Sequence, residues 1–134
     1  MSGVVFRLAV LSALAFLLYG SWAAFANRAH GLDAALWAFG VQGFSSALTT
    51  ALMGGVIERL RRPLGDTLGA KLVASAVATA AAGVCHVCLH LLAGTPEIAR
   101  TVIPSVVVGF LYAVTYAAWT GRASAASAPR RATP

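Results

Sequence analysis

Residues 72–93 read LVASAVATAAAGVCHVCLHLLA, a stretch of 22 residues without a single Asp, Glu, Lys or Arg. A helix that crosses the hydrocarbon core of a membrane needs roughly 20 apolar residues, each rising about 1.5 Å. Hydrocarbon offers no hydrogen-bond partner to an open backbone, so a stretch of this kind has to be helical. The sequence therefore predicts a transmembrane helix here.

Three further uncharged stretches have the same character, and they occupy residues 8–26, 34–57 and 101–121. The connections between the four stretches are short, so neighbouring helices should pack antiparallel. We expect an all-α fold, an integral membrane bundle of four transmembrane helices that fills residues 1–121. The end of the chain, residues 122–134, is rich in Ala, Ser and Pro, and we expect a disordered cytoplasmic tail there.

Composition agrees with a chain that is surrounded by lipid. Apolar residues make up 59% of the chain and charged residues only 10%, whereas soluble domains carry about 25% charged residues. The formal charge of +6 is compatible with nucleic acid, but the basic residues lie at the ends of apolar runs, where they anchor helices at the membrane interface. We therefore expect membrane lipids as partners and no nucleic acid.

The distribution of Arg and Lys predicts the orientation in the membrane. In a four-span topology, one side carries eight basic residues, namely Arg7, Arg59, Arg61, Arg62, Lys71, Arg122, Arg130 and Arg131. The other side carries only Arg28 and Arg100. Short segments rich in basic residues stay in the cytoplasm, so both termini should be cytoplasmic, in a bacterial-type inner (plasma) membrane.

The first span has a second interpretation. Arg7, the apolar core that follows it and the sequence AFA at residues 24–26 resemble a secretory signal with a small-x-small cleavage site. The span is longer than a usual signal core, and Tyr19 and Trp22 suit an aromatic belt at the interface. We expect a retained span, while cleavage would leave three spans with the same orientation.

Small residues repeat at four-residue spacing on two of the predicted helices. They are Gly43, Ala47, Ala51 and Gly55 in the second span, and Ala74, Ala78 and Ala82 in the third. Apolar area does not drive helix association in lipid, so close packing of such residues and polar contacts must do so. We expect the second and third spans to approach each other closely.

The densest group of reactive side chains is Cys85-His86-Val87-Cys88-Leu89-His90. Covalent haem attachment needs Cys-x-x-Cys-His, and Leu89 stands in the place of that histidine. A zinc site takes four ligands, which a single helix cannot arrange around a metal. We expect no metal and no cofactor, and a haem or metal redox protein that uses His86, His90 and the cysteines is our third functional hypothesis.

Polar side chains inside the spans and in the outer connections predict a binding site. A titratable group inside a span is costly and indicates function, and His86 is the deepest one apart from the cysteine thiols. Gln42 in the second span lies at a comparable depth and shares a helix face with Ser46. The guanidinium fork of arginine matches phosphate oxygens. The predicted substrate-binding residues are Arg28, Gln42, Ser46, His86, His90 and Arg100.

A structural interpretation of the same residues stays open beside the functional one. His86 is then a neutral histidine that bonds to a neighbouring helix, and the charges of the outer connections only cap helices and anchor them at the interface.

Two families of small membrane proteins bear on the sequence. Residues 43–50, GFSSALTT, resemble a Gly-Phe-x-x-x-Leu-Thr-Thr stretch of fluoride channels, but the likeness covers eight residues, lies in the second span instead of the third, and lacks the glycine-rich first helix of that family. Small multidrug transporters have a similar length, yet their characteristic glutamate in the first span is absent here. Neither resemblance implies a function for this chain.

Functions from three classes fit the sequence. We favour a non-enzymatic protein that moves or holds an amphiphilic molecule, such as a lipid or a lipid-linked headgroup. The second hypothesis is an accessory or scaffold subunit of a larger membrane complex, and the third is the redox protein named above. Four short spans leave little room for a transport pathway inside a single chain, so we expect a homo-oligomer or a second membrane protein as partner.

Overall fold

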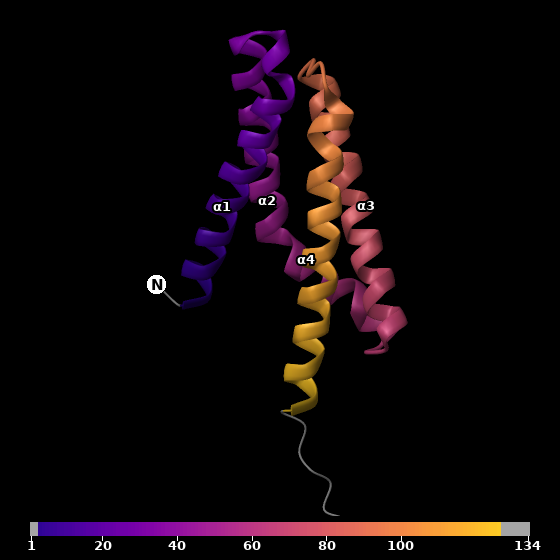
Figure 1. Cartoon of the computed structure of the whole chain (residues 1–134). Helices are drawn as coiled ribbons and strands as arrows, with labels where there is room; N and C mark the ends of the chain where they lie inside the picture. The colour runs from indigo at the N-terminus through magenta and orange to yellow at the C-terminus, as the bar shows by residue number, and fades with distance from the viewer. Residues whose placement is uncertain (1–2, 127–134) are drawn as a thin grey trace, which may run out of the picture.

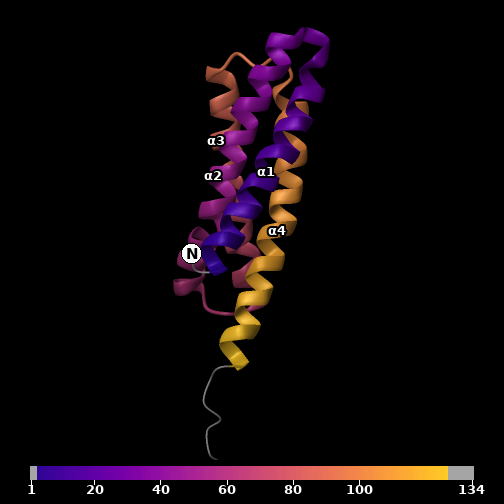
Figure 2. The same cartoon turned by 90° about the vertical axis from the view of Figure 1, so that its left-hand side faces the viewer.

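The computed structural model of the chain describes residues 3–126, which form four long α-helices and one short 3₁₀ helix (Figure 1). The elements are α1 (Gly3–Asn27), η1 (Arg28–His30), α2 (Leu32–Leu64), α3 (Leu68–Leu92) and α4 (Ile98–Ala126). Successive helices run antiparallel, and the described chain begins and ends at the same end of the bundle (Figures 1 and 2). The predicted all-α bundle of four helices is confirmed.

Three of these helices are long and apolar enough to cross a membrane. The qualifying segments are Leu8–His30, Leu68–Leu92 and Ile98–Trp119. α2 has the length but is less apolar, because it carries Gln42, Ser45 and Ser46, whose side chains are buried inside the bundle. These three helices indicate that the chain is a membrane protein. That α2 also crosses the membrane stays a prediction, which its position alongside the other three helices supports.

The helices are longer than the predicted spans. α2 continues to Leu64 and ends at Gly65, whose φ of 82° only glycine adopts easily. α3 begins at Leu68, where the Oγ1 of Thr67 accepts a hydrogen bond from the N–H of Ala70 at 3.2 Å.

The prediction of a disordered tail from residue 122 is wrong for residues 122–126. α4 continues through Ala126, because the alanines of this segment are the strongest helix formers. The rest of the predicted tail, residues 127–134, lies outside the part of the chain that the structure describes.

The four helices form two antiparallel pairs. α2 packs most extensively along α1, and α3 packs most extensively along α4 (Figure 1). A Cβ atom on Gly43 of α2 would lie 2.9 Å from Cδ2 of Phe16 on α1, so this glycine lets α1 approach. The second and third spans do contact each other, as expected, but α2 packs more extensively along α1, because Gly43 seats an aromatic ring of α1.

The two pairs meet in a small apolar core near the end of the bundle where the described chain begins. Met53 and Ile57 of α2 pack there with Ala78 of α3, and α4 adds Ala113 and Ala117. Ala78 of the third span therefore contributes to the contact between α2 and α3 at this core.

Gly43→Ala should lower the free energy of unfolding by about 1–3 kcal/mol, because the new methyl group overpacks the contact with Phe16. Gly55→Ala is the matched control, since a Cβ at this glycine of the same helix meets open space. The control should be neutral or should stabilise by at most about 1 kcal/mol through helix propensity. Thermal unfolding in detergent micelles measures both, and equal midpoints would contradict the predicted contact.

Candidate functional site

One buried amide of α2 connects three helices. Gln42 is fully buried, and its Oε1 accepts a hydrogen bond from Nε2 of His90 on α3 at 2.6 Å. Its Nε2 donates to Oγ of Ser105 on α4 at 2.8 Å and to Oγ of Ser46 on its own helix at 3.1 Å. Both N–H groups and the carbonyl oxygen of the amide are thus satisfied by uncharged partners.

Carbonyl partners determine where the two histidines carry their protons. A carbonyl oxygen only accepts, so His90 holds a proton on Nε2, and its Nδ1 then accepts from Oγ1 of Thr95 at 2.8 Å. In His86 the arrangement is reversed. Its Nδ1 donates to the carbonyl oxygen of Ala82 at 2.7 Å, and its Nε2 accepts from Oγ of Ser46 at 3.4 Å. Both rings are fully bonded in the neutral form.

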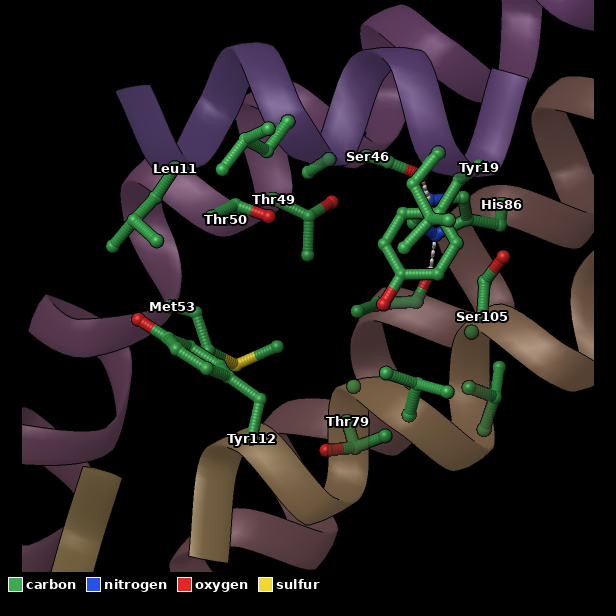
Figure 3. A pocket seen from close by; sticks show the side chains of 18 residues that line it. Leu11, Tyr19, Ser46, Thr49, Thr50, Met53, Thr79, His86, Ser105 and Tyr112 are labelled. Atoms are coloured by element: carbon green, nitrogen blue, oxygen red, sulfur yellow. Dashed lines mark hydrogen bonds between the residues drawn. The ribbon is translucent and has the colours of Figure 1, made fainter. Parts of the chain in front are cut away.

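A cavity of about 430 Å³ adjoins this network and is lined by residues of all four helices (Figure 3). Its polar wall includes Ser46, His86 and Ser105, and most of the remaining lining is apolar. The volume lies within the range of roughly 300–1,000 Å³ that small-molecule sites occupy. The network therefore forms one wall of a space large enough for a ligand.

The cavity is open on one side. Leu14 and Leu18 of α1 and Val108 of α4 line it, and these same side chains are exposed. In a membrane, the exposed apolar side of the bundle faces lipid, so the opening between α1 and α4 leads to the bilayer and not to water.

A second set of hydrogen bonds joins α1 to α4 at the end opposite the described termini. The indole Nε1 of Trp22 donates to the carbonyl oxygen of Arg100 at 2.7 Å. The fully buried Asn27 donates from Nδ2 to Oγ1 of Thr101 at 2.9 Å, and its Oδ1 accepts from the N–H of Glu97 at 2.9 Å. Asn27 therefore satisfies a backbone donor at the start of α4 and holds α1 against it.

The structure brings four of the six predicted site residues together and separates the other two. Gln42, Ser46, His86 and His90 form the network described above. Arg28 is exposed; its Nη1 donates to the carbonyl oxygen of Phe25 at 2.6 Å, and its guanidinium carbon lies 3.8 Å from the centre of the Phe25 ring. Arg100 is also exposed. Among residues 3–126, no hydrogen bond or ion pair joins either guanidinium to the network.

The reactive group on α3 is divided between two faces of the helix. His86 and His90 are buried, whereas Cys85 and Cys88 are exposed free thiols. In the described part of the chain, no group of three or more His, Cys, Asp or Glu side chains is placed to hold a metal ion. The cysteines and histidines therefore do not form one site.

Sequence reasoning did not assign three residues to this region, namely Asn27, Thr95 and Ser105. Asn27 had a detectable signal, because a carboxamide at the end of an apolar run needs hydrogen-bond partners. Thr95 and Ser105 are small polar residues whose partners come from other helices, so position along the chain does not reveal them.

No protein-family model, no curated protein and no solved structure matches this chain.

Gln42→Leu should lower the free energy of unfolding by about 1–3 kcal/mol, because it leaves the Nε2–H of His90 buried without an acceptor. Thr115→Val is the control, since Thr115 is exposed and its hydroxyl bonds only the carbonyl oxygen of Leu111 on its own helix. The control should change stability by less than about 0.5 kcal/mol. Equal losses in the two variants would show that the amide does not hold the bundle together.

Proposed function

We propose that the protein binds one amphiphilic lipid at a time in the four-helix cavity, and that it holds or moves this lipid within the membrane. One observation carries the proposal: a mostly apolar space with a polar wall is open on the side where exposed apolar side chains of α1 and α4 line it. Ligand sites commonly combine a mostly apolar lining with a few placed polar groups that orient the ligand.

The geometry supports a lateral route into the site. The exposed lining residues lie on α1 and α4, so an acyl or isoprenoid chain enters between these two helices. The hydrogen bonds of Trp22 and Asn27 hold the same two helices together at one end of the bundle. The polar part of the lipid then lies against Ser46, His86 and Ser105.

The proposed function is binding and not bond breaking. The N–H groups of Gln42, His86 and His90 all donate to acceptors inside the protein. The role of this network in the proposal is to position the helices and to form one wall of the cavity. A ligand that is held and released requires no group of the network to change its bonding.

We also propose a homo-oligomer or a second membrane protein as partner. The cavity of a single bundle is open on one side, and carrying a lipid between leaflets requires something to close that side. The proposed location is the bacterial-type inner membrane with both termini in the cytoplasm. Arg59, Arg62 and Lys71 support this orientation, since they lie at the end of the bundle where the described chain begins and ends.

Gly109→Phe should abolish or strongly reduce the lipid retained by the protein. Gly109 lines the cavity and a Cβ there meets open space, so the ring fills the site without a clash at its first atom. Gly55→Phe is the matched control, because Gly55 also has open space but lies outside the cavity lining. Native mass spectrometry of each variant released from lipid nanodiscs counts the bound lipid. Equal retention by wild type and Gly109→Phe would overturn the proposed function.

A further inference from the structure

We infer that the exposed face of α2 binds an anionic phospholipid of the bilayer, with the lipid phosphate at Arg59 and Arg62 and an acyl chain along the apolar residues that precede them. Neither arginine lines the cavity, so this site is separate from it and the inference does not depend on the proposed function. Three features of α2 carry the inference: the partners of the nearby carboxylates, an exposed apolar stripe, and the length of the helix.

Both carboxylates at this end of the bundle are engaged by other groups. The chain has four acidic residues, and two of them, Glu58 and Asp66, lie near the connection between α2 and α3 (Figure 1). Asp66 pairs with Arg61, and its Oδ1 lies 3.3 Å from Nζ of Lys71. Glu58 accepts a hydrogen bond from the hydroxyl of Tyr116 on α4 at 2.7 Å. The two carboxylates are thus directed to α4 and to the α2–α3 connection.

Arg59 and Arg62 carry charges that no carboxylate within residues 3–126 pairs with. Both side chains are exposed. Residues three apart are neighbours on the surface of a helix, so one phosphate group can contact both side chains. The planar fork of a guanidinium matches the oxygens of a phosphate. An anionic headgroup therefore has the charge and the shape that this pair of arginines fits.

An exposed apolar stripe leads along α2 to the two arginines. Phe44, Leu48 and Leu52 are 72%, 63% and 57% exposed, and none of them lines the cavity. At 3.6 residues per turn, positions 44, 48, 52, 59 and 62 lie on one face of the helix. The helix rises about 10 Å between Leu52 and Arg59. The acyl chain and the phosphate of a single lipid can therefore contact both parts of this face.

The length of α2 places the arginines beyond the hydrocarbon. The helix has 33 residues and is about 50 Å long, whereas the hydrocarbon core of a bilayer is about 30 Å thick. Arg59 and Arg62 lie in the last two turns, close to the end of the helix at Gly65. At the depth of the headgroups, anionic lipids attract basic side chains.

Native mass spectrometry of the protein released from nanodiscs tests the headgroup preference. The nanodiscs contain equal amounts of phosphatidylglycerol and phosphatidylcholine. Each basic side chain near an anionic surface contributes roughly a fivefold preference. In Arg59→Gln/Arg62→Gln, the ratio of retained phosphatidylglycerol to phosphatidylcholine should therefore fall about 20-fold, and Arg59→Lys/Arg62→Lys should restore part of it. For the wild type, the ratio should also fall at high salt concentration, because salt screens exposed charges.

Arg28→Gln/Arg100→Gln is the matched control, since it removes two exposed arginines from the opposite end of the bundle. The lipid ratio of this control should stay unchanged. Gly109→Phe, which fills the cavity, should keep the excess of phosphatidylglycerol while it loses the cavity lipid. The inference and the proposed function can therefore fail separately.

Two results would overturn the inference. Equal lipid ratios in wild type and Arg59→Gln/Arg62→Gln would show that the two arginines only orient the chain in the membrane. An equal fall in the control pair would show that the preference comes from the net charge of the protein and not from this face of α2.

Discussion

The side chain of Gln42 carries two N–H donors and a carbonyl oxygen, and hydrocarbon satisfies none of them. Their partners therefore have to come from the protein, and they come from His90 on α3 and Ser105 on α4 as well as from α2 itself. Each hydrogen bond between helices contributes only about 0.6 kcal/mol on average in a membrane. Leaving a buried donor unpaired costs more free energy than such a bond contributes. The amide therefore acts mainly by destabilising arrangements in which α2 is rotated, or α3 and α4 are shifted along their axes, so that its partners are lost.

α1 is held in a different way, and this difference creates the cavity. Within the described residues, no hydrogen bond joins α1 to the network around Gln42. α1 is attached by the close contact of Phe16 with Gly43 on α2 and by the bonds of Trp22 and Asn27 to α4 at one end. Side chains of both α1 and α4 line the cavity, so the two helices do not fill the space between them. If α1 were joined to the network by hydrogen bonds as α3 and α4 are, the four helices would leave no such space between them.

Hydropathy predicted the four helices because charged residues end each apolar run, but it placed the helix ends poorly. A helix continues past the apolar run wherever the sequence permits, as α2 does through Arg61 and α4 does to Ala126. Gln42, Ser46, His86 and His90 were found because polar residues inside apolar runs are conspicuous. Depth along each span suggested Gln42 beside His86, whereas the stagger of the helices pairs Gln42 with His90. A charge in a connecting loop gives no such guidance, which is why the local stacking of Arg28 on Phe25 was not foreseen.

The polar stripe along α3 has two parts that differ in their hydrogen bonds. Around His86 and His90 every donor has an acceptor within the protein, and this part positions the helices. At Thr79, beside the cavity, the hydroxyl is buried and unpaired, which costs stability in the ligand-free protein. Ser75, on the same helix but outside the cavity lining, is buried and unpaired as well, so an unpaired hydroxyl on α3 does not by itself mark the cavity. The cavity is distinguished by its shape instead: it is a mostly apolar space beside the bonded histidine network, and exposed side chains of α1 and α4 line its open side.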